Sequence, residues 1–469
     1  MTPAKVVPHP TRAERVARGK AARAAVGLAA HATFDPSATR ADPVSLLEQQ
    51  ASTRVPELVP IRYGRMLVSP FAFYRGAALV MAADLAGAPD TGLRTQLCGD
   101  AHMSNFGVFG TPERNLVFDV NDFDETLPGP FEWDVKRLAA SLEIAGRDNG
   151  FKEKRRRAVV LSAATGYRTA MLDFAGQSNI AVWYAHLDMD RGLAEVRSLI
   201  ATAGAQRTEA ELAKARTKDS LQAFDKLATV VDGVPQIVSD PPLVVRLSDL
   251  IAGDDVESEF SAVRDLLRTY RRTLSSDRKH LLDQYRLADV ARKVVGVGSV
   301  GMRAWILLLE GVDGNDPMFL QAKEAQPSVL AAFAGPSSYA NHGQRVVAGQ
   351  HLMQEVSDIF LGWQRISDID GVQRDYYVRQ LRDWKRSAAP EGMRPTDMAV
   401  YARLCGWTLA RAHARSGDRV AIAAYLGNKD TFDNAIADFA ASYADQNERD
   451  YAALRSAAKS GRIQVQRGL

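Results

Sequence analysis

The chain has 469 residues, of which 46% are hydrophobic and 25% charged, a composition typical of a globular protein with a sizeable core. Its net charge of +3 is small for this length, so charge alone indicates no nucleic-acid partner, and its two cysteines, Cys98 and Cys405, argue against a disulfide scaffold. No uninterrupted apolar stretch approaches the roughly 18 residues that span a bilayer, and the basic N-terminus lacks the apolar segment of a secretory signal, so we expect a cytoplasmic protein that binds neither membrane nor nucleic acid.

The first 55 residues are rich in alanine, arginine and proline, and we expect them to wrap the surface, with a weak helical period between Thr11 and Ala30. The pattern becomes regular from Pro60 onwards. It predicts a helix over 77–85 and then a short strand over 94–98, which leads into a loop that begins with glycine and aspartate.

The first group of chemically informative residues follows this strand. It comprises the loop Gly99-Asp100-Ala101-His102-Met103-Ser104-Asn105, a predicted strand over 115–120, and the turn Asn121-Asp122-Phe123-Asp124-Glu125. Phosphoryl-transfer enzymes place a base and hard oxygen ligands for Mg²⁺ in such loops, because the transferred group spreads negative charge over its oxygens. Asp100 is the candidate general base, and Asn105, Asp122 and Asp124 are candidate magnesium ligands. Asp119, inside the strand, is an alternative ligand.

The middle of the chain is predicted to be mainly helical. A helix begins at Phe131-Glu132-Trp133-Asp134, and residues 150–230 continue in helices, with the charged stretch 214–219 as a solvated face. Residues 230–247 alternate apolar and turn residues, which indicates a hairpin or an irregular arm.

A second group of informative residues begins at Val294. Gly296, Gly298, Ser299 and Gly301 precede a pattern of strand, turn and strand that ends at Lys323. A dinucleotide fingerprint requires a helix that opens at the glycines, whereas a β-hairpin is typical of a glycine loop that covers a nucleotide and is followed by a lysine on a later strand. We therefore expect these glycines, Ser299 and Lys323 to bind nucleotide phosphates; a tight turn without a ligand is the alternative.

The remaining elements complete this prediction. A helix over 344–363 carries Glu355 in its middle, and we expect Glu355 to form an ion pair with Lys323, with Glu324 as an alternative partner. A strand follows over 375–381, of which 376–381 is expected to be the hinge that contacts adenine. A long helix over 398–414 and further helices over 420–460 close the chain.

These residues resemble known families. The two acidic loops resemble the catalytic and metal loops of aminoglycoside phosphotransferases and other kinase-like enzymes, and the hairpin with the following helix resembles their small lobe. From about Arg54 to Gly417 the chain resembles the bacterial family of domain of unknown function 2252. The motifs that carry this resemblance are 69–76 (SPFAFYRG), 99–102 (GDAH), 121–125 (NDFDE) and 133–137 (WDVKR). The family name assigns no activity.

The resemblance implies an α+β, kinase-like fold of two lobes. The catalytic loop precedes the glycine loop by about 200 residues, the reverse of the kinase order, and circular permutation explains this because domain termini often lie close together. We expect a basic leader over 1–55, a mainly helical large lobe over 56–290, a small antiparallel β-sheet lobe over 291–385, and C-terminal helices over 386–469 that complete the large lobe.

The expected activity is transfer of the γ-phosphoryl group of ATP, with Mg²⁺, to a hydroxyl or amine of a small molecule or a protein, with the acceptor site built from residues 150–290. Three alternatives stay open: nucleotidyl transfer on the same fold, a nucleotide-binding pseudokinase, and a metal-dependent hydrolase that uses Asp119, Asp122 and Asp124. Around the site, we expect His102 to form a hydrogen bond within its loop and Asp134 to brace that loop. Arg75 and Arg137 are candidate partners for the site carboxylates, and an ion pair at the surface or in the core is the alternative for either.

Overall fold

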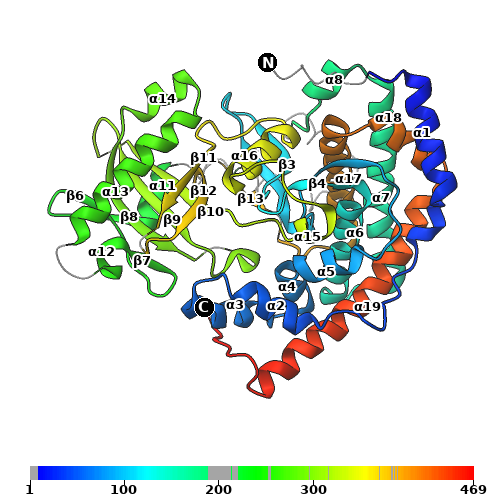
Figure 1. The fold of residues 1–469 in the computed structure, drawn as a ribbon, viewed down its shortest axis with the longest axis horizontal. Helices are drawn as coiled ribbons and strands as arrows, with labels where there is room; N and C mark the ends of the chain where they lie inside the picture. The colour runs from blue at the N-terminus through cyan, green and yellow to red at the C-terminus, as the bar shows by residue number, and fades with distance from the viewer. Residues whose placement is uncertain are drawn as a thin grey trace.

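The computed structural model describes residues 9–188, 213, 220–251, 255–294, 296–314, 316–368, 370–381, 384, 386–387 and 389–468. Helices and a six-stranded antiparallel sheet make up the molecule, so the α+β class is confirmed. In Figure 1 the sheet lies on the left, and the longest helices lie on the right and along the lower edge. The predicted charged face over 214–219 lies outside the described residues.

The helical part is built around α6, a helix whose first 16 residues are all buried. Its core includes residues of α7, α17, α18 and α19, so segments from both halves of the chain pack together. The helices of this part are α1 (Arg12–Ala25), α2 (Pro43–Ala51), α3 (Val59–Met66), α4 (Pro70–Gly76), α5 (Ala78–Leu85), α6 (Phe131–Asp148), α7 (Glu153–Gly176), α8 (Asn179–Tyr184), α17 (Pro395–Ser416), α18 (Arg419–Leu426) and α19 (Thr431–Lys459).

The six-stranded sheet has the order β11-β12-β10-β9-β8-β7, and every neighbouring pair is antiparallel. Its strands are β7 (Val244–Arg246), β8 (Arg286–Lys293), β9 (Ala304–Glu310), β10 (Pro317–Glu324), β11 (Gly362–Ser367) and β12 (Gln373–Gln380). The two central strands β9 and β10 are almost entirely buried, because both faces of the sheet are covered. Strand β10 therefore carries Lys323 into the protein interior.

Helices from residues 220–282 cover this sheet. Leu307 and Leu309 belong to one apolar cluster with Tyr270 of α13, and their neighbours Ile306 and Leu308 belong to another with Ala223 of α11. The covering elements are α11 (Ser220–Leu227), β5 (Ala228–Val231), β6 (Val234–Ile237), α12 (Leu247–Leu250), α13 (Asp255–Tyr270) and α14 (Ser276–Leu282). Residues 220–282 thus pack on the sheet, whereas we expected them in the mainly helical large lobe. Strands β5 and β6 form the expected hairpin.

Two small sheets hold the loops between the two parts. One pairs β1 (Arg94–Leu97) with β4 (Leu127–Pro130), and the other has the order β13-β2-β3, with β2 at Phe106–Gly110, β3 at Leu116–Val120 and β13 at Arg386–Ser387. Helices α15 (Ala331–Ala334) and α16 (His342–Met353) connect β10 to β11. The helix predicted over 344–363 therefore ends ten residues early, because Gln354 has extended backbone angles (φ −72°, ψ 151°) and the chain then enters strand β11.

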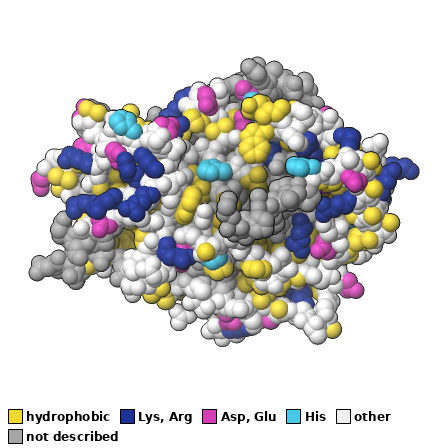
Figure 2. All heavy atoms as spheres, turned by 45° about the horizontal axis from the view of Figure 1, so that its top comes forward, with side chains coloured by type: hydrophobic (Ala, Val, Ile, Leu, Met, Phe, Trp, Pro, Cys, Tyr) yellow, Lys and Arg dark blue, Asp and Glu magenta, His cyan; other side chains and the backbone are white. Residues whose placement is uncertain are grey.

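Basic side chains gather on the outer face of the sheet part. They lie on the left of the face that Figure 2 shows, where α13 and α14 are found. Ion pairs join Arg268 to Asp265, Arg271 to Asp283, Arg278 to Asp277 and Arg286 to Glu310. Much of the positive charge is thus compensated within the patch, as on an ordinary solvated face. None of the helices that the structure describes combines the length and apolar character needed to cross a bilayer.

Candidate active site

A cavity of about 210 Å³ brings together residues from three distant parts of the chain. The loops after β1 and β3 contribute acidic and amide side chains, the sheet part contributes glycines and cations, and α2 and α4 complete the wall. Its lining includes the expected Asp100, Asn105, Asp122, Asp124, Gly296, Gly298, Ser299 and Lys323, together with Gln50, Arg75, His102, Gln321 and Arg379. Eight of the ten predicted site residues therefore share one cavity; Gly301 and Glu355 do not line it.

The loop that carries Asp100 is fixed by its main chain. Gly99 has a φ of +84°, and a Cβ atom there would lie 2.3 Å from the carbonyl oxygen of Glu125, so only glycine fits. Asp134, in the first turn of α6, accepts hydrogen bonds from the backbone nitrogens of Cys98 (2.8 Å) and Gly99 (3.1 Å). The predicted bracing role of Asp134 is confirmed.

The carboxylate of Asp100 is oriented by Arg137. Arg137 Nε donates to Asp100 Oδ1 at 2.9 Å, and Arg137 Nη2 lies 2.8 Å from the same oxygen. The Arg137 guanidinium stacks 3.8 Å from the ring centre of Tyr74. Asn105 Nδ2 donates to the carbonyl oxygen of Asp100 at 2.7 Å, which leaves the amide oxygen of Asn105 available to a ligand in the cavity.

His102 forms hydrogen bonds within its loop through its main chain: its nitrogen donates to the carbonyl oxygen of Asp100 and its carbonyl oxygen accepts from the nitrogen of Asn105, both at 2.8 Å. Its Nε2 lies 3.8 Å from Asp100 Oδ2, too far for a hydrogen bond, and its buried Nδ1 has no partner among the described residues. Burial lowers the pKa of His102 to about 4, although the charge of Asp100 opposes this shift. The ring is therefore neutral near pH 7 and makes no hydrogen bond within its loop.

Lys323 connects the sheet part to the acidic loop over 121–125, through a contact with Asp124, which lies 199 residues earlier in the sequence. Its Nζ donates to Asp124 Oδ2 and lies 3.8 Å from Asp122 Oδ2. Asp124 also accepts hydrogen bonds from Tyr377 Oη (2.7 Å) and Ser299 Oγ (3.3 Å). Burial alone would lower the pKa of Lys323, but the two carboxylates outweigh it and hold the pKa above its ordinary value. Lys323 is thus charged and lies between the two expected metal ligands.

The expected ion pair between Lys323 and Glu355 is not formed. Glu355 lies beyond the end of α16, where its carboxylate is 3.4 Å from His186 Nδ1 and its backbone nitrogen donates to Asp119 Oδ2 at 2.9 Å. Burial raises the pKa of Glu355 to about 7, while His186 opposes the shift. The helix end, and with it Glu355, is directed towards Asp119 and away from the cavity.

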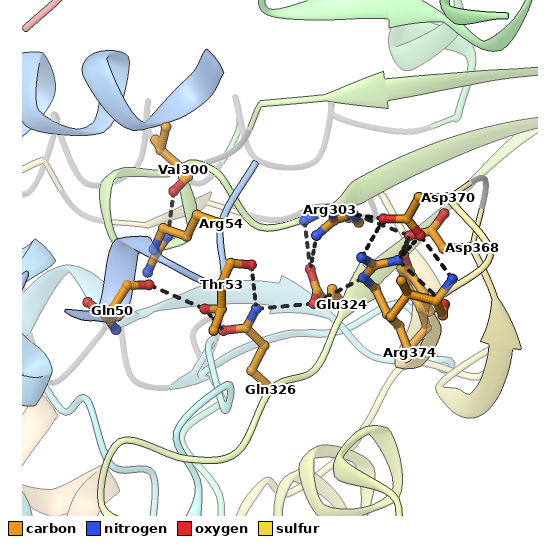
Figure 3. Close-up of polar contacts among 12 residues, drawn as sticks. Gln50, Thr53, Arg54, Val300, Arg303, Glu324, Gln326, Asp368, Asp370 and Arg374 are labelled. Carbon is orange, nitrogen blue, oxygen red and sulfur yellow. Dashed lines mark hydrogen bonds and ion pairs between the residues drawn. The ribbon is translucent and has the colours of Figure 1, made fainter. Parts of the chain in front are cut away.

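Glu324, the alternative partner, points to the opposite face of β10, because successive side chains on a strand alternate. Figure 3 shows its carboxylate in a network with two arginines of the sheet part. Arg303 lies 3.6 Å from Glu324 and Arg374 lies 3.8 Å from it. Both arginines also pair with Asp368 and Asp370, so this network is complete without Lys323.

Asp119 does not face the cavity. It is 1% exposed, and both its oxygens accept hydrogen bonds from Arg411 Nη2 of α17, at 2.7 and 2.6 Å. The cluster of three aspartates expected for a hydrolase is therefore not formed, and no group of three His, Cys, Asp or Glu within the described part of the chain is placed to hold a metal ion. Asp122, Asp124 and Asn105 still offer oxygen ligands on the cavity wall, which fits Mg²⁺ because that ion is commonly held by one or two carboxylates plus substrate phosphates.

The glycine segment is followed by the expected hairpin of β9 and β10, but it is also preceded by strand β8, which was not expected, and a short 3₁₀ turn lies within it over Val297–Ser299. Gly301 has a φ of +87°, and its carbonyl oxygen accepts a hydrogen bond from the backbone nitrogen of Val55 at 2.8 Å. Arg54 Nη1 donates to the carbonyl oxygen of Val300 (Figure 3). The glycine loop is thus held in place by Arg54 and Val55, the last residues of the expected leader over 1–55.

Several side chains of the site were not predicted, although two of them fall within the expected hinge over 376–381. Tyr377 and Arg379 lie on β12, whose register places Tyr377 directly opposite Lys323. Arg379 Nη1 donates to the carbonyl oxygen of Asn121 at 3.3 Å. Their spacing of two residues on an expected strand is the signal that could have placed them on the same face. The expected hinge over 376–381 lies mostly inside this strand, between β10 and β11.

Helix α16 reaches the acidic loop through Arg345. The guanidinium donates to the carbonyl oxygens of Thr126 (2.7 Å), Asp124 (2.8 Å) and Gln326 (2.9 Å). Within its described length, His342–Met353, this helix carries no glutamate. Arg345 therefore holds the main chain of the acidic loop in place, and the loop in turn brings its carboxylates to Lys323.

Comparison with known proteins identifies the family of this chain. Residues 54–457 match the model of the family described as "Uncharacterized protein conserved in bacteria (DUF2252)". No curated protein and no solved structure matches the chain.

Proposed function

Because the chain belongs to the bacterial family of domain of unknown function 2252, whose description assigns no activity, we propose a function from the site alone: ATP- and Mg²⁺-dependent phosphotransfer to a hydroxyl or amine acceptor. The observation that carries this proposal is the contact of Lys323 with Asp122 and Asp124 in a cavity also lined by Asp100 and the glycine loop. These are the types of residue that phosphoryl transfer requires, and they come from distant parts of the chain that line one cavity.

Each residue has a role that follows from its position. The backbone of Gly296, Gly298 and Ser299 would approach the phosphates, and Lys323 would bind their oxygens. Asp122, Asp124 and Asn105 would hold the metal ion. Bound Mg²⁺-ATP would supply the phosphoryl group and compensate its charge.

Asp100 would accept the proton of the acceptor hydroxyl through Oδ2, because Oδ1 is occupied by Arg137. Its orientation is fixed from two directions, by Arg137 at the carboxylate and by Asp134 at the preceding main chain. Such a fixed carboxylate loses little freedom when the acceptor binds.

We also propose the finer description of the fold, a circularly permuted kinase-like arrangement of two lobes. Its support is the order of elements: the glycine loop lies between β8 and β9, Lys323 lies on the next strand β10, and α16 follows. The packing of α11–α14 on the six-stranded sheet extends the proposed small lobe to residues 220–385. Residues 56–188 and 386–468 would form the large lobe.

One observation favours a second candidate, a nucleotide-binding pseudokinase. Active protein kinases hold the phosphate-binding lysine with a glutamate from the helix that follows, whereas Lys323 contacts the carboxylates expected to bind metal. A protein in which Lys323 keeps these partners would bind nucleotide without transferring phosphate. Nucleotidyl transfer on the same site would release pyrophosphate in place of ADP.

Turnover of ATP labelled at the γ position, with Mg²⁺, tests the proposal. We expect ADP formation by the wild-type chain and a decrease of about 10²–10⁴-fold in Asp100→Asn, the usual contribution of a general base. Asp173→Asn, an exposed carboxylate on α7, is the matched control and should leave turnover unchanged. Release of labelled pyrophosphate in place of ADP would indicate nucleotidyl transfer, nucleotide binding without release of either product would favour the pseudokinase, and absence of nucleotide binding would overturn all three.

A further inference from the structure

Arg75 is a cation of the cavity whose side chain makes no hydrogen bond or ion pair with another residue that the structure describes. It lies in the last turn of α4, a helix that begins at Pro70 after the capping residue Ser69. Its side chain is half-buried and lines the cavity beside Asp100 and His102. The buried Nε of Arg75 has no hydrogen-bond partner among the described residues. A guanidinium has five donors, so a buried donor without an acceptor is costly in the absence of a ligand.

The other cations of this region are already engaged. Lys323 contacts Asp122 and Asp124, Arg137 contacts Asp100, and Arg379 donates to the carbonyl oxygen of Asn121. Burial lowers the pKa of Arg75, and the more distant carboxylates of Asp100 and Glu391 only partly oppose this effect. Arg75 therefore differs from these neighbours, because no acidic side chain of the described part of the chain is in contact with its guanidinium.

The carboxylate of Asp100 is in contact with Arg137 and not with Arg75. Its Oδ1 is occupied by both Nε and Nη2 of Arg137, and Arg137 is fixed in turn by a hydrogen bond of 2.8 Å to the carbonyl oxygen of Tyr74. On the other side, a Cβ atom on Gly298 would lie 3.2 Å from the carbonyl oxygen of Arg75. Arg75 thus lies between the carboxylate of Asp100 and the tip of the glycine loop.

We propose that Arg75 binds an oxyanion, a phosphate or a carboxylate, in the part of the cavity bounded by Asp100 and the glycine loop. A guanidinium offers two parallel N–H donors that match two oxygens of such a group. The inference rests on the proposed function, which places the reacting acceptor beside Asp100. The oxyanion has two sources: the terminal phosphate of the nucleotide, or an acidic group on the acceptor, which would make the acceptor an anionic molecule.

Calorimetric titration of the full chain separates these sources. If Arg75 binds the terminal phosphate, Arg75→Gln weakens binding of a non-hydrolysable ATP analogue at least about tenfold, the loss of one charge-assisted hydrogen bond, and leaves ADP unaffected. If Arg75 binds the acceptor, Arg75→Gln leaves both nucleotides unaffected but abolishes binding of inorganic phosphate to protein saturated with the ATP analogue. The proposal is overturned if the variant binds all three probes as the wild type does.

Two further variants control this experiment. Arg75→Lys keeps the charge but not the paired donors, and we expect intermediate affinity for the probe that Arg75→Gln weakens; it also serves if Arg75→Gln does not fold. Arg155→Gln removes an exposed arginine from α7 and should bind every probe normally. If the wild type binds no nucleotide, the proposed function fails. Phosphate titration of the nucleotide-free protein then still tests Arg75, since equal affinities of wild type and Arg75→Gln overturn its role.

Discussion

Lys323→Met removes the cation that lies between the two carboxylates of the site. At an effective dielectric constant of 20, one such pair at 3.8 Å has a Coulomb energy of about 4 kcal/mol, and the cost of burying the lysine offsets part of it. The Lys323 and Asp124 side chains are 4% and 14% exposed, whereas Asp122 is 32% exposed and better solvated. Removing one partner of a buried pair costs about 3–5 kcal/mol, and we expect the lower end of this range.

For the same variant we also predict a changed response to Mg²⁺ and to the nucleotide. Without Lys323, Asp122 and Asp124 repel each other, so free Mg²⁺ should stabilise Lys323→Met more than it stabilises the wild type. Affinity for the ATP analogue should fall, because the phosphates lose their lysine. Lys429→Met, an exposed lysine after α18, is the matched control and should change neither property.

Thermal and urea unfolding, with and without Mg²⁺, measure these effects, and calorimetry measures nucleotide affinity. Equal stability of Lys323→Met and wild type would show that the buried contacts contribute nothing. An identical response to Mg²⁺ in both proteins would refute the assignment of the two carboxylates as metal ligands. Unchanged nucleotide affinity would remove Lys323 from the phosphate site.

Three other outcomes are expected. Asp119→Asn leaves Arg411 buried without its carboxylate and should destabilise the fold by about 3–5 kcal/mol in urea unfolding, with the Mg²⁺ dependence of the folded protein retained; loss of that dependence would make Asp119 a ligand. Burial raises the pKa of Glu132 to about 7 from 4.5, so the folded state binds more protons between these values and the contribution of Glu132 to stability falls as pH rises through them. Glu132→Gln should remove this slope from pH-dependent unfolding, and an unchanged slope would contradict the shift. Gly99→Ala adds a Cβ atom to a residue with a φ of +84° and brings it against Glu125, so we expect the free energy of unfolding to fall by about 1–3 kcal/mol and ATP turnover to decrease. An alanine variant with a normal melting temperature and normal turnover would disprove this constraint.

Most elements could be predicted from local patterns. The strand over 94–98, the helix from Phe131 and the strand–turn–strand before Lys323 all appear, within a residue or two. The helix expected over 344–363 is wrong in its second half. We expected the helix to continue past Met353. In the structure Arg411 donates a hydrogen bond to the carbonyl oxygen of Met353, the helix ends there, and the chain continues to strand β11.

In the candidate site, too, some features follow from local sequence and others depend on contacts between remote segments. Residues in sequence motifs, such as Asp100 and Asp122, could be assigned to the cavity because a loop after a strand places them at its end. Partners from elsewhere in the chain could not. Arg137 and Arg75 were equal candidates for the carboxylates, and only the packing of α4 against α6 assigns Arg137 to Asp100.

What the sequence determined by itself is therefore local: which segments form helices and strands, which loops carry acidic, amide and glycine residues, and that Lys323 lies on a strand. Only the tertiary structure decided which of these groups meet. Lys323 binds Asp122 and Asp124 and not Glu355, and Asp119 pairs with Arg411 inside the core. The physical reason is that a buried charge needs an opposite charge or hydrogen-bond partners beside it, and the packing of remote segments determines which of these groups is within reach.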